Sequence, residues 1–273
     1  MVEGPLTRWL LRLGTGLVLA FIYFPLVVIG LYAFNDDVTQ AWPIQNWTTK
    51  WFTVAFHDPD VRDAFFLSLK AATLATLIAL VLGTCLSFVI SRYRFFGRET
   101  ISFLVVLPIA LPGIVTGLAL NATINTVFEP IGIGFGLTTI VIGHATFCIV
   151  VVYNNAAARL RRLAGSLEEA SYDLGADAFQ TFRFVTFPQM RTALAAGALL
   201  AFALSFDEVI VTIFTAGAQQ TLPIWIYANL FRPVEQPIVN VVALFVILVS
   251  IVPIYFAQRL SEGAARGVPG GEK

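Results

Sequence analysis

The chain has 273 residues, of which 58% are hydrophobic and only 12% are charged. Soluble domains carry about 25% charged residues, so this composition and a mean hydropathy of +0.80 indicate an integral membrane protein. The formal net charge is zero, and the two cysteines, Cys85 and Cys148, lie in apolar runs. The placement of the cysteines makes a disulfide framework unexpected. The total charge by itself says nothing about nucleic acid, and we expect no nucleic-acid partner for this membrane protein.

Six stretches are apolar enough to cross a membrane, because a helical span needs about 20 mainly apolar residues. They predict an all-α fold of six transmembrane helices, at 14–34, 64–91, 101–121, 136–158, 192–216 and 238–259. The first stretch is too long for the core of a signal peptide, so we interpret it as a retained span. We expect a cytoplasmic N-terminus at 1–13, a transmembrane domain at 14–260 and a disordered, polar tail at 261–273.

The uneven placement of Lys and Arg predicts the orientation of the spans. One side holds Arg8, Arg12, Arg92, Arg94, Arg98, Arg159, Arg161, Arg162, Arg183, Arg191, Arg259, Arg266 and Lys273. The other side holds only Lys50, Arg62 and Arg232. Because cytoplasmic loops carry the excess of positive charge, both termini are expected in the cytoplasm.

On the expected outer side, residues 46–58 place Trp47, Trp51, Val54 and Phe56 at near-helical spacing. This pattern favours a short amphipathic helix that starts at an Asn46 cap and lies on membrane lipid. A loop with incidental aromatic residues is the alternative.

The third stretch contains Pro108 and Pro112 within the segment LPIALPG. Proline removes a helical hydrogen bond, so this segment predicts either a simple kink or a true break. Non-helical backbone at membrane depth is tolerated where protein buries it or where it lines a cavity. The sequence leaves both alternatives open.

Signatures of enzymatic chemistry are missing from the sequence, which has no GxxxxGK[ST], GxSxG or HExxH motif. His144 and Cys148 are four residues apart and could touch one metal ion, but two ligands are too few for a site. A packed helix interior is the simpler interpretation of this pair. We expect no catalytic residue, no metal and no cofactor in the chain itself.

The loop at 159–191 carries the strongest local signals. Ser166 and Glu169 form the S-x-x-E pattern of a capping box, and Gly175 suits the left-handed residue that ends a helix. Asp177 predicts the cap of a second helix with Phe179, Phe182 and Val185, and Pro188 predicts a break before the fifth span. Such a helix–turn–helix exposes aromatic and acidic side chains, so we expect it to dock a separate protein.

This loop resembles the EAA motif of bacterial ABC-importer permeases. Glu169-Ala170-Ser171 is followed at the motif's spacing by Gly175 and then by Val185-Thr186-Phe187-Pro188. The resemblance implies that 166–188 form the coupling helix that sits in a cleft of a cytoplasmic ATPase. The residues expected to couple are Glu168, Glu169, Ala170, Asp173, Gly175, Ala176, Phe179 and Pro188.

Further segments, SRYRFFG, LPIALPGIVTG, GHATFC, LSFDEVIVTIFTAG and TLPIWIY, resemble the spermidine/putrescine permeases, in particular their second permease subunit. The resemblance implies a bacterial inner-membrane protein with three kinds of partner: a second permease subunit, two ATP-binding cassette ATPase subunits that bind the ATP, and a periplasmic substrate-binding protein. Alternating access would move the cargo. Permeases for iron(III), thiamine, phosphonate or opine-type amines remain alternatives, as does a channel or scaffold without energy coupling.

Asp207 and Glu208 interrupt the fifth apolar stretch near its middle. A charge at the centre of a membrane helix costs about 2.5–3.5 kcal/mol on insertion scales, so such residues usually mark a substrate path. On a continuous helix Ser205, Glu208, Thr212 and Thr215 would share one polar stripe. The predicted path consists of Asp207, Glu208, Ser205, Phe206 and Thr212. The alternative is that the acids are structural and pair with a neighbouring subunit.

Overall fold

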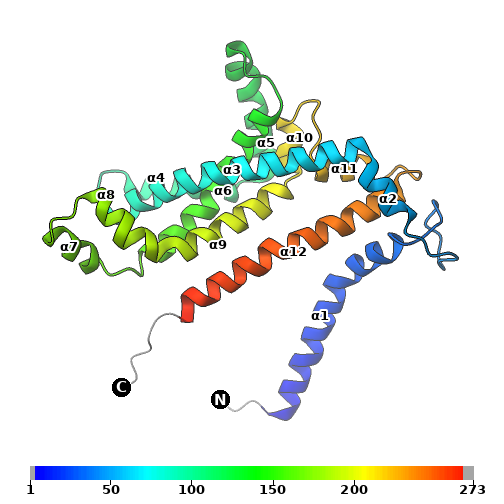
Figure 1. The fold of residues 1–273 in the computed structure, drawn as a ribbon, viewed down its shortest axis with the longest axis horizontal. Coiled ribbons are helices and arrows are strands. Elements are labelled where there is room, and N and C mark those ends of the chain that lie inside the picture. The colour runs from blue at the N-terminus through cyan, green and yellow to red at the C-terminus, as the bar shows by residue number, and fades with distance from the viewer. Residues whose placement is uncertain (1–3, 267–273) are drawn as a thin grey trace. The chain divides into compact units, whose positions relative to one another are not determined.

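The computed structural model describes residues 4–266 of the chain, and its elements are helices (Figure 1). The α-helices are α1 (Pro5–Tyr32), α2 (Lys50–His57), α3 (Pro59–Arg92), α4 (Arg98–Ala110), α5 (Gly113–Thr123), α6 (Leu137–Leu160), α7 (Ser166–Asp173), α8 (Ala178–Thr181), α9 (Phe187–Phe206), α10 (Ile210–Thr215), α11 (Leu222–Asn229) and α12 (Gln236–Arg266). The π-helical turns are η1 (Ile124–Phe128) and η3 (Phe182–Thr186), and η2 (Glu129–Ile131) is a 3₁₀ turn. The predicted all-α class is confirmed.

By length and composition, four helical segments can cross a membrane. They are Leu6–Tyr32, Pro59–Arg92, Leu137–Leu160 and Ala178–Phe206. The pair Arg98–Ala110 and Gly113–Ile131 adds a fifth if its bent halves are one span, and Gln236–Val252 is a shorter apolar helix. The segments thus lie where the six spans are predicted, but they do not give six complete straight crossings. The helix α12 continues through residue 266, beyond the expected domain boundary at 260, and 267–273 lie outside the described residues.

The third predicted span is broken rather than gently kinked. The helices α4 and α5 meet at 103° around Leu111 and Pro112. Leu111 is extended, with ψ 145°, because a proline ring disfavours helical backbone in the residue before it. Pro108, in contrast, lies inside α4 without ending it.

The chain divides into two compact units, which we describe separately. The first unit comprises 1–63 and 225–249. In it the Trp51 indole donates to the Asn35 carbonyl at 2.9 Å. The predicted Asn46 cap is wrong: α2 begins at Lys50 after Thr49. The cause is that backbone bonds between 34–36 and 46–48 hold the latter segment extended, with Trp47 bridged to Asn35.

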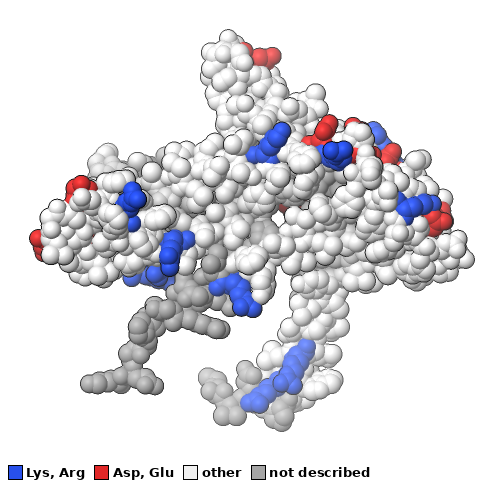
Figure 2. Space-filling model, viewed as in Figure 1, with Lys and Arg blue, Asp and Glu red and all other residues white. Residues whose placement is uncertain are grey.

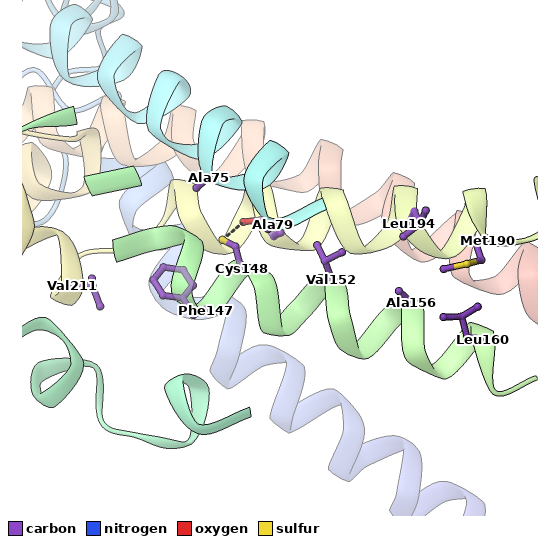
Figure 3. Packing of buried hydrophobic residues seen from close by; sticks show 11 residues of the cluster. Ala75, Ala79, Phe147, Cys148, Val152, Ala156, Leu160, Met190, Leu194 and Val211 are labelled. Atoms are coloured by element: carbon purple, nitrogen blue, oxygen red, sulfur yellow. Dashed lines mark hydrogen bonds between the residues drawn. The ribbon is translucent and has the colours of Figure 1, made fainter. Parts of the chain in front are cut away.

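The second unit comprises 64–224 and 250–273, and its core lies where α3, α6 and α9 run alongside one another (Figure 1). Small residues line this contact, including Ala75, Ala79, Ala156 and Ala201 (Figure 3 labels the first three). A side chain at Gly83 would come within 2.9 Å of the Ile149 carbonyl, so the backbones of α3 and α6 approach closely there. Such contacts between small residues are typical of membrane helices.

Candidate functional site

The fifth predicted span is interrupted at the two acids. The helix α9 ends at Phe206 and α10 begins at Ile210, so Asp207, Glu208 and Val209 lie between them. The expected continuous helix over 192–216 is therefore wrong at this point. At the break the Glu208 carboxylate accepts a hydrogen bond from the Val211 amide in the first turn of α10, at 2.9 Å. Acidic side chains that bond nearby amides compete with helical backbone bonds.

The two acids have different surroundings. Glu208 is half-buried, and its carboxylate accepts the hydrogen bond from the Val211 amide at the start of α10. Asp207 is exposed, and within residues 4–266 its carboxylate has no hydrogen-bond or ion-pair partner. Within the described residues, Glu208 therefore has a structural contact, whereas the Asp207 carboxylate has none.

The other predicted path residues are buried. Ser205 and Thr212 lie on opposite sides of the break, and both bond the His144 ring of α6. Phe206 is 5% exposed and packs against Phe65 and Phe202, with ring centroids 6.3 and 6.0 Å apart. Its ring therefore does not face open space in this chain. The exposed apolar side chains next to Asp207 in the sequence are Leu204 and Ile210.

The helix α10 is held in place by α5 and α6. The Asn121 amide donates to the Phe214 carbonyl at 2.8 Å, and the Thr139 hydroxyl donates to the Thr215 carbonyl at 2.7 Å. At Gly117 a Cβ atom would lie only 2.4 Å from the Phe214 ring, so the absence of a side chain there lets α10 approach α5. Sequence reasoning missed these residues, since isolated polar groups in apolar helices do not reveal their partners.

The loop at 159–191, which is predicted to couple to an ATPase and is called the coupling loop below, contains two of its four predicted local features. Gly175 adopts φ +86°, and the Ala176 amide bonds the Ser171 carbonyl at 3.1 Å, which closes the end of α7. Asp177 accepts from the Gln180 amide at 2.8 Å and caps α8, as predicted. The Ser166 cap is wrong, because Ser166 is already the first residue of α7 and Gly165 occupies the cap position.

The predicted break at Pro188 is also wrong. The helix continues from Ala178 to Phe206 through the π-helical turn η3. Pro188 lies in the first turn of α9, just after this turn. The chain passes Pro188 without a break, and the irregular π-helical turn stands directly before the residue that lacks an N–H.

Glu168 faces inward and joins α7 to two other elements. Its Oε1 atom accepts from Arg92 Nη2 and from the Thr186 hydroxyl, each at 3.0 Å. The Arg92 Nε atom lies 3.0 Å from Oε2, and the two side chains are only 21% and 15% exposed. The contact joins the end of α3 to α7 and η3.

The outer surface of the loop combines acids with exposed apolar groups. Charged side chains of both signs lie around α7 and α8 in Figure 2. The predicted coupling residues Glu169, Ala170, Asp173, Gly175, Phe179 and Pro188 are exposed, and Ala176 is half-buried. Sequence reasoning missed Leu174, which is 89% exposed at the tip of the turn. A surface of this kind can dock another protein.

Solved structures share the fold. A bacterial ABC transporter involved in the import of the acidic polysaccharide alginate has a chain with a TM-score of 0.68 and 16% identity, and the match covers 96% of this chain and 99% of that chain. A chain of the MetNI methionine ABC transporter in an inward-facing conformation has a TM-score of 0.62 and 15% identity, with 75% and 95% covered.

Several curated proteins resemble the chain over nearly its whole length. The putrescine transport system permease protein PotI of Escherichia coli (strain K12) is 31% identical, with 98% of this chain and 96% of the relative covered. The spermidine/putrescine transport system permease protein PotC of the same organism is 29% identical, with 94% and 95% covered. The sulfate transport system permease protein CysT of Salmonella typhimurium is 28% identical, with 95% of each covered.

The family model described as binding-protein-dependent transport system inner membrane component matches residues 75–266. This range includes the break around Asp207 and the whole coupling loop. The predicted family is confirmed, and so is the prediction that the chain is a membrane transport subunit rather than an enzyme. The chain belongs to the family of binding-protein-dependent transport system inner membrane components.

Proposed function

We propose that this chain is a permease subunit of an ATP-driven importer whose cargo is a polyamine-like organic cation of the spermidine/putrescine class. The similarity to PotI, a putrescine permease protein, and to PotC, a spermidine/putrescine permease protein, supports this cargo class. The structural observation that carries the proposal is the exposed Asp207 carboxylate, which stands in the break of an apolar helix without a partner among the described residues.

The chemistry of this break suits a cation with methylene segments. A carboxylate lowers the energy of a cation in a region of low dielectric far more than it would in water. The exposed Leu204 and Ile210 precede and follow the acid in sequence and offer apolar contact for methylene groups. Ionisable residues at membrane depth usually face a bundle interior or an aqueous cavity. Asp207 therefore serves as an anionic step in the path.

The coupling loop supplies the connection to ATP hydrolysis. Exposed Glu169, Asp173, Leu174 and Phe179 form the surface that docks a cytoplasmic ATPase. The Arg92–Glu168 contact passes movement of α7 to the end of α3. The complete importer contains a second permease subunit, two ATPase subunits that bind the ATP, and a periplasmic substrate-binding protein. Both termini of this chain lie in the cytoplasm.

Another small solute is the second candidate cargo, and the similarity to the sulfate permease CysT favours it. The unpaired Asp207 argues against an anion, because a like charge in the path raises the energy of the passing solute. The charge of the cargo therefore separates the two candidates.

Uptake by the reconstituted complex tests the proposal. Vesicles that contain the chain with its partner subunits and binding protein are given ATP and labelled putrescine, spermidine or sulfate in turn. We expect ATP-dependent uptake of at least one polyamine and none of sulfate. Uptake of sulfate without uptake of either polyamine would contradict the proposed cargo.

A further inference from the structure

His144 is a buried polar side chain in α6 that bonds both halves of the broken fifth span. It is 1% exposed. Its Nδ1 atom lies 2.7 Å from the Ser205 hydroxyl in the last turn of α9. Its Nε2 atom lies 2.8 Å from the Thr212 hydroxyl in α10. One ring therefore joins the residues on either side of the break to the same point on α6.

The hydrogen-bond pattern fixes the direction of the bond between His144 and Thr212, and a neutral ring then sets the direction of the other. The Thr212 hydroxyl donates its single proton to the Glu208 carbonyl at 2.7 Å, so it accepts from the histidine. Nε2 is then the protonated ring nitrogen, and Nδ1 of a neutral ring accepts from the Ser205 hydroxyl. The chain of donors runs from Ser205 through His144 and Thr212 to the backbone of Glu208, inside the break.

Other contacts near the break are local or lie at its far end. The Asp207 amide bonds the Ala203 carbonyl at 3.2 Å, and the Glu208 carboxylate bonds the Val211 amide, so both contacts stay within the same segment of chain. Asn121 and Thr139 reach only Phe214 and Thr215, at the C-terminal end of α10. Among these contacts, His144 alone ties both edges of the break to a neighbouring helix.

We propose that His144 is a positioning residue that holds the break open and thereby sets where the Asp207 carboxylate stands. The inference rests on the proposed cargo role of Asp207. Asp207 follows Ser205 by two residues and precedes Thr212 by five. Loss of the ring leaves the buried Ser205 hydroxyl without its partner and removes the donor to Thr212, which keeps only its bond to the Glu208 carbonyl. The segment then relaxes to satisfy the Ser205 hydroxyl in another way.

The variants separate this role from general packing. His144→Leu removes both bonds, and Thr212→Val removes one of them while the side-chain shape is kept. Thr215→Val is the matched control, because Thr215 is equally buried in the same helix but its hydroxyl donates only to the Val211 carbonyl of its own helix. His144→Gln serves as the conservative variant, since its amide can still donate to Thr212.

The first measurement reports the position of residue 207 without any cargo. The full complex is prepared with the native Cys85 and Cys148 replaced, and Asp207→Cys introduces a single thiol into this chain. The measurement is the rate at which this thiol reacts with a small cationic methanethiosulfonate reagent. We expect His144→Leu and Thr212→Val to change this rate by about tenfold, as the loss of a buried hydrogen-bond partner allows. Thr215→Val should change it by less than about twofold, and His144→Gln should restore most of the native rate. Equal rates in all variants would overturn the proposal.

The second measurement links position to transport. Polyamine uptake is compared for His144→Leu, Asp207→Asn and the double variant, at equal amounts of assembled complex. If His144 acts through Asp207, uptake by the double variant should lie within about twofold of uptake by the less active of the two single variants. Fully multiplicative losses would overturn the connection to Asp207. If Asp207→Asn alone leaves uptake unchanged, the proposed cargo role of Asp207 fails, while the thiol reaction rates still decide whether His144 positions the break.

Discussion

Arg92 at the end of α3 and Glu168 in α7 form a largely buried ion pair, with Nη2 3.0 Å from Oε1 and Nε 3.0 Å from Oε2. The pair joins a membrane helix to the loop that we propose docks the ATPase. A coupling loop can move a span only if the two are firmly connected. Glu168 lies inside the permease, whereas Glu169 and Asp173 are exposed.

Glu168→Gln should uncouple ATP hydrolysis from uptake. The change removes a charge-assisted contact that contributes roughly 1.5–3 kcal/mol to the docking of α7. We expect polyamine uptake to fall several-fold while ATP hydrolysis persists in the assembled complex. The exchanged pair Arg92→Glu with Glu168→Arg should recover part of the uptake. An unchanged ratio of transport to hydrolysis in Glu168→Gln would exclude this connection.

Gly175→Ala should weaken binding of the ATPase. The residue has φ +86°, a conformation that costs about 1–2 kcal/mol for a residue with a side chain. Gly165→Ala is the matched control, because Gly165 has φ −60° and open space around it at the other end of α7. Co-purification of the ATPase with each variant measures the difference. Equal recovery of the ATPase with both variants would show that the turn does not need its left-handed residue.

Gly117→Ala should displace α10. The added methyl group would lie 2.4 Å from the Phe214 ring, and such overpacking typically costs 1–3 kcal/mol. Gly113→Ala in the same helix should be tolerated, since the nearest atom there, Ile210 Cγ2, is 3.5 Å away. The melting temperature of the purified complex and its uptake rate are the measurements. Similar melting temperatures for the two variants would contradict the tight contact between α5 and α10.

Labelling of introduced cysteines should report the orientation. In a chain without Cys85 and Cys148, thiols introduced by Asp58→Cys and Gln236→Cys should react with an impermeant reagent added to intact cells. Thiols introduced by Arg94→Cys and Ser166→Cys should react only after the membrane is opened. This follows from the excess of Lys and Arg on the proposed cytoplasmic side. Reaction at position 94 in intact cells would reverse the orientation.

Features that depend on neighbouring residues in the chain could be predicted from the sequence. Gly175 and Asp177 have their conformations because of local backbone requirements, and the EAA spacing identifies the loop that contains them. Hydropathy also locates the apolar helices, because the membrane imposes a length on each span. These features led to the correct fold class and family.

The break around Asp207 could not be predicted, because the helical spacing of Ser205, Glu208, Thr212 and Thr215 continues across it and favours one unbroken helix. The Glu208 carboxylate can bond a nearby backbone amide in competition with the helical backbone bonds. Hydropathy and periodicity do not show which of these bonds forms. His144 contacts Ser205 and Thr212, which follow it in the chain by 61 and 68 positions. Only the packing of α6 against α9 and α10 brings them together.

The most direct test of the central claim is the uptake of labelled polyamine by the complex with Asp207→Asn, measured at equal assembly and with binding-protein-stimulated ATP hydrolysis as the control. The substitution keeps the shape of the side chain and removes its charge at an exposed position without a partner among the described residues. We predict that uptake at low polyamine concentration falls at least several-fold, while assembly and ATP hydrolysis change little, because the loss is confined to the attraction between carboxylate and cation. Native uptake by a fully assembled Asp207→Asn complex would contradict the claim that this carboxylate serves a cationic cargo.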